Sequence, residues 1–107
     1  MDALQSTGNP LTTLKHTCGD VAETFQSITS YVAQSSGKNV VGVLITVETN
    51  PIRFSWGTAP TQAGVGHPLE VGASLKLTNH KQIIDFRFIN KTNGSNAVIN
   101  ITPEVSR

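Results

Sequence analysis

The segment 40–48, VVGVLITVE, constrains the fold of this chain more than any other feature of the sequence. Successive side chains of a β-strand point to opposite faces, so a half-buried strand shows a period of two. Four branched apolar side chains share one face of this segment: Val41, Val43, Ile45 and Val47. The segment is therefore predicted to be a strand in the centre of a sheet.

The same alternation recurs in four later segments, 52–57, 69–77, 81–90 and 97–105. In 69–77 the apolar face comprises Leu69, Val71, Ala73, Leu75 and Leu77. In 81–90 the residues Ile84, Phe86 and Phe88 alternate with Ile83, Asp85 and Arg87. Each of these segments is predicted to be one strand, because the alternation continues along its length.

Glycine, proline and asparagine separate the predicted strands. Residues 49–51 include Pro51, which cannot donate to a ladder, so they predict a turn and a hairpin between 40–48 and 52–57. Short strands at a spacing of about ten residues are typical of a sandwich or jelly roll. The predicted fold is all-β, an antiparallel β-sandwich that is jelly-roll-like, with an extended N-terminal arm.

The segment 20–36 is ambiguous between helix and strand. Val21, Phe25, Ile28 and Val32 form a helical stripe, and Asp20 and Glu23 are spaced as a capping box. Branched and aromatic side chains and the all-β context favour a strand instead. We expect a strand here and keep the helix as the alternative.

The chain is long enough for one domain. Residues 1–14 are predicted to form an arm, either frayed or ordered by a neighbouring subunit, since Gly8, Asn9 and Pro10 interrupt regular structure. Residues 15–107 are predicted to form the β-sandwich domain.

Charge argues against nucleic acid as a partner. Only 14% of residues are charged, against roughly 25% in typical domains. The eight Lys and Arg residues are scattered, whereas nucleic-acid binding needs a concentrated basic patch. The sequence shows neither a secretory signal nor an apolar run near 18 residues, so we expect synthesis in a cytoplasm and no membrane partner.

No catalytic or metal-binding motif is recognisable. His16, His67 and His80 lie in or beside predicted turns, outside known motifs, and are expected to be surface residues. Cys18 is the only cysteine, which excludes an intrachain disulfide and favours a small buried hydrophobe over a reactive thiol. We predict a non-enzyme with no cofactor and no metal.

Five residues are predicted to contact other proteins: Leu4, Leu11, Leu14, Arg53 and Trp56. Trp and Arg are the residues most enriched where interfaces hold their binding energy. The more conservative interpretation of Trp56 is an ordinary core residue, because Ile52 and Phe54 share its face.

Several runs resemble a family of small structural proteins of tailed-phage virions: VVGVLITVETNPIRFSWGTAPT, GHPLEVGASLKL, IIDFRFIN and AVINITPE. The resemblance extends from Val21 to Glu104 and departs from the family pattern over residues 27–39, which are longer here. It implies a β-sandwich or jelly-roll protein on the capsid exterior or at the neck or tail, commonly self-associated. It transfers no catalytic residues.

The resemblance implies a decoration or cement protein that binds the major capsid protein, or another virion protein, on a virion assembled in a host cytoplasm. A homo-oligomer is expected. The alternative is a component of the neck, tail or tail fibre that acts as a glycan-binding module, in which Trp56 or Tyr31 stacks on sugar. A third hypothesis is a host-directed inhibitor that is absent from particles.

Overall fold

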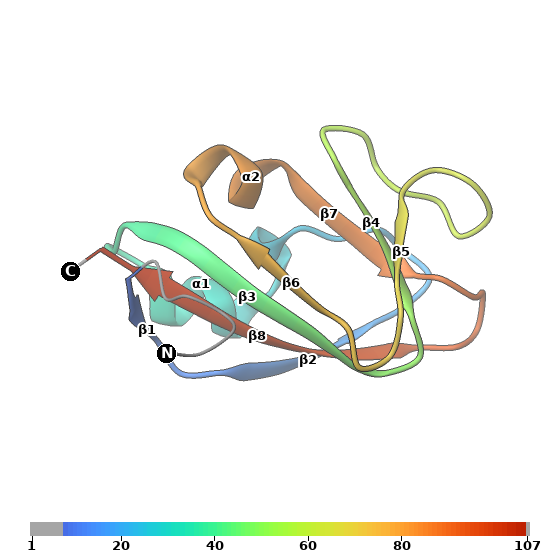
Figure 1. The fold of residues 1–107 in the computed structure, drawn as a ribbon, viewed down its shortest axis with the longest axis horizontal. Helices are drawn as coiled ribbons and strands as arrows, with labels where there is room; N and C mark the ends of the chain where they lie inside the picture. Colours follow the sequence, from blue (N-terminus) through green and yellow to red (C-terminus); the bar gives the residue numbers. More distant parts are fainter. Residues whose placement is uncertain (1–7, 107) are drawn as a thin grey trace.

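The computed structural model describes residues 8–106, and its strands form two antiparallel sheets (Figure 1). The elements, in chain order, are β1 (Asn9–Pro10), β2 (Leu14–Cys18), the 3-10 helix η1 (Phe25–Ser27), α1 (Thr29–Ser35), β3 (Val40–Thr49), β4 (Ile52–Trp56), β5 (His67–Leu69), β6 (Ser74–Leu77), α2 (His80–Asp85), β7 (Phe86–Asn90) and β8 (Ala97–Val105). The prediction of antiparallel β-structure is confirmed.

Sheet A contains five strands in the order β1-β8-β3-β6, with β2 also paired to β8. Its long pair, β3 and β8, alternates between buried and partly exposed residues along most of its length. Ile45 lies opposite Ile101, and both are fully buried. The predicted central position of β3 is confirmed, since β8 and β6 flank it.

Sheet B contains three strands in the order β5-β4-β7, so the predicted hairpin between 40–48 and 52–57 is wrong. The chain leaves sheet A at Asn50, whose φ of 56° lies in the left-handed region. Its side chain donates to Asn96 O at 2.9 Å, and Pro51 O accepts from Lys91 N. These contacts redirect the chain, so β3 and β4 are adjacent in sequence but belong to different sheets.

The predicted strand 69–77 is also wrong as a single element. Leu69 ends β5 in sheet B, a turn at Gly72 with a φ of 86° follows, and the last four residues of the segment form β6 in sheet A. Gly72 N donates to Val47 O, which ties the turn to β3. Val71, predicted to lie on the apolar face, is 53% exposed, because the turn breaks the alternation.

The segment 81–90 is a strand only in its second half, since α2 occupies its first half. Asn79 caps α2 by accepting a hydrogen bond from Gln82 N, and Lys81 and Asp85 form an ion pair one helical turn apart. As a consequence, Ile83 is buried and Ile84 is 55% exposed, although a strand would have put Ile84 on the apolar face.

The strand expected over 20–36 is wrong, and helices η1 and α1 replace it. Phe25 in η1, Tyr31 in α1 and Ile28, which lies between the two helices in an extended conformation, are all buried. The capping box is wrong too: the N-cap residues are Thr24 and Ile28, and neither makes a side-chain cap bond.

One buried cluster joins the two sheets and the helices. It includes Ile45, Ile99 and Ile101 from sheet A and Phe54, Phe86 and Phe88 from sheet B. Phe25 stacks on Phe86 at 5.3 Å and on Tyr31 at 5.1 Å between ring centroids. The helices therefore complete the core.

The part of the predicted arm that the structure describes, residues 8–14, runs along β8. Asn9 and Pro10 pair with Val105 and Glu104, and Leu11 N donates to Pro103 O. The Gln34 side chain bonds both Thr12 N (3.2 Å) and Thr12 O (2.8 Å). This segment is thus held by β8 and α1, whereas Leu4 lies outside the described residues.

Candidate functional site

Trp56 is the largest exposed aromatic side chain in the described part of the chain, at 40% exposure. It ends β4 opposite Phe86, and its Nε1 donates to Gln82 O at 3.0 Å. Its ring packs edge-on against Phe54, 5.5 Å between centroids, and against Phe86 at 6.0 Å. Trp56 is therefore held in one orientation at the surface and is not the core residue of the conservative interpretation.

A hollow of about 300 Å³, here called the Trp56 hollow, is lined by Trp56 and by four residues at α2: Asn79, Lys81, Gln82 and Asp85. The side-chain oxygens of Asn79 and Gln82 accept from Gln82 N and Thr78 N. Neither amide nitrogen bonds another residue within 8–106. The surface of the hollow is mainly apolar, and two of the residues that line it carry free amide donors.

The other predicted interface residues do not gather around Trp56. Arg53 donates to Gln62 O at 3.1 Å and to Gly66 O at 3.2 Å, so it holds the 57–66 loop. Leu14 lies in sheet A and packs against the core, and Leu11 is partly buried beside β8. The structure places Arg53 and Trp56 on one strand and the two leucines in or beside the other sheet.

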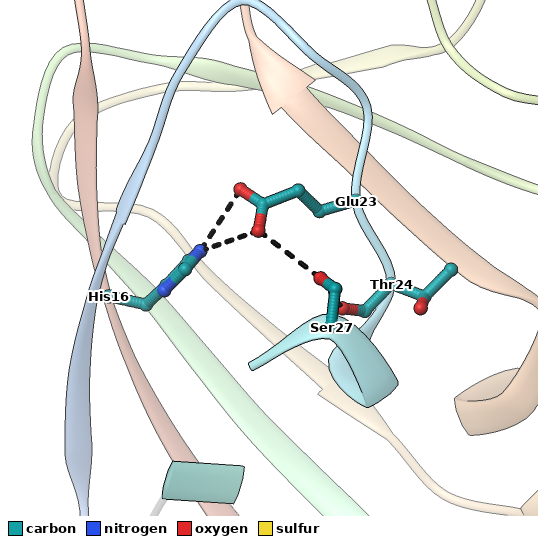
Figure 2. A network of polar contacts seen from close by, with 4 residues as sticks. All are labelled: His16, Glu23, Thr24 and Ser27. Atoms are coloured by element: carbon teal, nitrogen blue, oxygen red, sulfur yellow. Dashed lines mark hydrogen bonds and ion pairs between the residues drawn. The ribbon is translucent and has the colours of Figure 1, made fainter. Parts of the chain in front are cut away.

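Figure 2 shows the polar cluster of His16, Glu23, Thr24 and Ser27. His16 Nε2 lies 3.0 Å from Glu23 Oε2, and Ser27 Oγ lies 3.2 Å from Glu23 Oε1 and 2.7 Å from Thr24 O. The carboxylate stands between the imidazole and the hydroxyl, whereas a catalytic triad places the imidazole in the middle. The geometry joins β2 to η1 and does not activate Ser27.

His16 was expected at the surface beside a turn, but it lies on β2 with its side chain 20% exposed. Cys18 on the same strand is buried, as expected. Burial, with a smaller contribution from the charge of Glu23, raises the pKa of the Cys18 thiol to about 12. The thiolate is therefore scarce near neutral pH, which disfavours nucleophilic chemistry.

Asp20 anchors a second polar network. Its Oδ1 accepts from Asn90 Nδ2 (2.8 Å), Gly94 N (2.9 Å) and Gln62 Nε2 (3.0 Å). The hydrogen bond from Asn90, followed by that from Gly94, holds the pKa of Asp20 below its ordinary value of 3.8. The network connects three separate loops to β7 and has a structural role.

Sequence reasoning missed a second hollow, of about 350 Å³, between α1 and α2. We call it the Tyr31 hollow, since Tyr31 is among its lining residues. Tyr31 is 2% exposed, so its ring cannot stack on sugar as expected. The signal available in the sequence was the helical stripe that includes Phe25, Ile28 and Val32.

Within residues 8–106, no cluster of three or more His, Cys, Asp or Glu side chains could hold a metal, and no helix is long and apolar enough to cross a membrane. No protein-family model matches the chain, and no match is found among curated proteins or solved structures. The function must be argued from the residues themselves.

Proposed function

We propose that this chain is a non-catalytic structural protein of a tailed-phage particle, a decoration protein that binds the outer surface of the major capsid protein lattice. The runs that resemble such proteins support the proposal, as does the low charge. The observation that carries it is Trp56, which stays 40% exposed while the hydrogen bond to Gln82 O fixes its indole. A fixed aromatic anchor loses little side-chain entropy on binding.

The polar clusters support a role without catalysis. Ser27 is directed at a carboxylate and a backbone carbonyl, and Cys18 is buried. Glu23 is engaged by His16. Each group that could take part in a reaction is therefore either buried or hydrogen-bonded to another residue of the chain.

The mechanism of a decoration protein is added interface area. An interface of about 800 Å² per partner is of ordinary stable size, and repetition over a lattice multiplies its effect. We propose that the two sheets form a jelly-roll-like sandwich and that the protein self-associates on the capsid. The proposed arm is then the part of residues 1–14 that precedes the β8-paired segment and contains Leu4.

Binding to purified particles that lack this protein tests the proposal. The wild-type chain should attach at hundreds of copies per particle, and Trp56→Ala should weaken attachment at least about tenfold, the equivalent of 1.4 kcal/mol. Val71→Ala is the control, because Val71 is also exposed but lies in the β5–β6 turn. Circular dichroism must show that both variants are folded.

Two results would contradict the proposal. One is full attachment of a folded Trp56→Ala variant, which would remove Trp56 from the interface. The other is absence of the protein from purified particles, which would favour a host-directed role. Removal of residues 1–7 tests the arm separately, since undiminished attachment would exclude it.

A second candidate function is a glycan-binding module of a neck, tail or tail-fibre protein. The Trp56 hollow favours it, because an exposed indole in a mainly apolar hollow suits the apolar face of a sugar ring. Copy number discriminates between the two functions: tens of copies or fewer per particle would favour the neck, tail or fibre. A neutral-glycan array should then show binding that Trp56→Ala abolishes.

A further inference from the structure

The Tyr31 hollow lies on the other side of α2 from the Trp56 hollow. Tyr31 and Val32 of α1, Lys38 and Asn39 of the following loop, and Ile83 and Ile84 of α2 are among the residues that line it. Its volume of about 350 Å³ falls within the range of small-molecule sites. The two short helices and the loop after α1 thus border an open hollow large enough for a monosaccharide-sized ligand.

Tyr31 contributes an unpaired hydroxyl to this space. The residue is 2% exposed and its ring stacks on Phe25, yet its hydroxyl bonds no other residue in the described part of the chain. Within residues 8–106, every fully buried side-chain nitrogen or oxygen has a hydrogen-bond partner. The Tyr31 hydroxyl has none, so it must reach solvent, and Tyr31 lines the hollow. A nearly buried, unpartnered donor on a residue that lines a cavity is suited to a ligand.

The Tyr31 hydroxyl is neutral and can donate throughout the physiological range. Burial raises the pKa of Tyr31 from its ordinary value of 10 to about 12, further above that range. The ring cannot swing away, because Phe25 packs on it with an interplanar angle of 18°. The donor is therefore preorganised.

The charge of the lining favours an anion. Lys38 Nζ donates to Gln34 O at 3.1 Å, which leaves two of its three ammonium protons for a ligand. No Asp or Glu is among the lining residues in the described part of the chain. An anionic oxygen in the hollow would meet a cation with no competing carboxylate in the lining.

The remaining lining residues favour a polyhydroxylated ligand. Ser36, Asn39 and Gln26 carry neutral hydroxyl or amide groups. Val32, 37% exposed, and Ile84, 55% exposed, supply apolar surface beside them. Neutral donors and acceptors next to an apolar wall match the two kinds of surface on a sugar ring.

We propose that the Tyr31 hollow binds an acidic saccharide, with the carboxylate held by Lys38 and a neighbouring oxygen held by the Tyr31 hydroxyl. The apolar face of the sugar lies against Val32 and Ile84. This site uses none of the residues of the Trp56 hollow and does not depend on attachment to a capsid.

The experiment is a titration of the full chain with glucuronate, glucose and acetate, followed by amide chemical shifts. Glucuronate should shift signals of residues 31–40 and 80–84 saturably, with a dissociation constant of about 1 mM. Glucose and acetate should each bind at least about fivefold more weakly, because each lacks one part of the recognition. Equal affinity for the three probes, or the lack of a saturable shift in these residues, would overturn the proposal.

Three variants sharpen the test. Tyr31→Phe keeps the stacked ring and should weaken glucuronate binding about fivefold, and Lys38→Met should abolish the preference for glucuronate over glucose. Lys81→Met is the matched control, since Lys81 lines the Trp56 hollow, and it should bind as wild type does. Unchanged binding by the first two variants would overturn the proposal, as would tighter binding of a short acidic peptide than of glucuronate.

Discussion

The long strand pair of sheet A and the short strands of sheet B bury their side chains in different ways. In β8 buried and partly exposed residues alternate from Ala97 to Thr102. In β7 three consecutive residues, Phe88, Ile89 and Asn90, are all buried. Buried and exposed residues alternate along a strand that has one solvated face, and they do not alternate where both faces of a strand are buried.

The two regions also differ in what stabilises them. The β3–β8 pair places apolar side chains opposite one another, as with Ile45 and Ile101. Sheet B contributes Phe54, Phe86 and Phe88 to the core and also buries the side chain of Asn90 completely. Asn90 donates hydrogen bonds to Asp20 and Ser95 O and accepts one from Gln62. We expect apolar burial to dominate stability in sheet A and hydrogen bonding to matter more in sheet B.

The largest expected effect is in sheet A. Ile101→Ala should lower the free energy of unfolding by about 2–5 kcal/mol, because it leaves a cavity opposite Ile45 and beside Leu14. Urea unfolding measures the change. Thr17→Ala on the exposed face of β2 is the control and should change stability by at most about 0.5 kcal/mol. Similar losses for both would contradict the role given to the long pair.

Loss of the Asn90 side chain in sheet B should lower the free energy of unfolding by a smaller amount. Asn90→Ala removes a donor to Asp20 and an acceptor for Gln62, and should destabilise the protein by about 1–3 kcal/mol. The same urea measurement applies. A loss of stability as large as that of Ile101→Ala would contradict the expected difference between the two sheets.

The Asp20 network predicts a dependence on pH. The folded-state pKa of Asp20 is lowered, so its contribution to stability is present above the ordinary value of 3.8 and is lost as the pH falls below that value. Asp20→Asn should therefore be less stable than wild type at pH 7, and this difference should shrink at about pH 3. Urea midpoints at both values check it, and a difference that grows in acid would exclude the proposed linkage.

The smallest effect concerns the segment along β8. Gln34→Ala removes both side-chain bonds to Thr12 and should cost about 1 kcal/mol or less, since these groups are exposed. Amide exchange at Thr12 should accelerate, while exchange at Ile101 in β8 should follow global stability. Unchanged exchange at Thr12 would show that β8 alone holds this segment.

The sequence predicted the long strands well and the connections poorly. The alternation in β3 and β8 appears in the sequence over nine or more residues, so both strands were expected at nearly their observed positions. The segment 69–77 kept its period of two across the turn at Gly72, and nothing local showed that the chain changes sheet there. Helix α2 was not predicted, because the positions of Ile83 and Ile84 are compatible with the period of a helix and with that of a strand.

The candidate site was predicted only in part. Trp56 was named as an interface residue, but the orientation of its indole is fixed by the hydrogen bond to Gln82 O, which is 26 residues away. Arg53, named with it, is held by Gln62 O and Gly66 O. The Tyr31 hollow could not be predicted, since it needs α1 and α2 to lie together.

The sequence by itself determined that this protein is rich in antiparallel strands, that Cys18 forms no intrachain disulfide and that charge is sparse. These properties are local or compositional, so they can be read without a fold. Only the tertiary structure decided which strands share a sheet, which polar groups are paired and which aromatic side chain faces solvent. Those outcomes depend on contacts between residues far apart in the chain, and no local pattern specifies them.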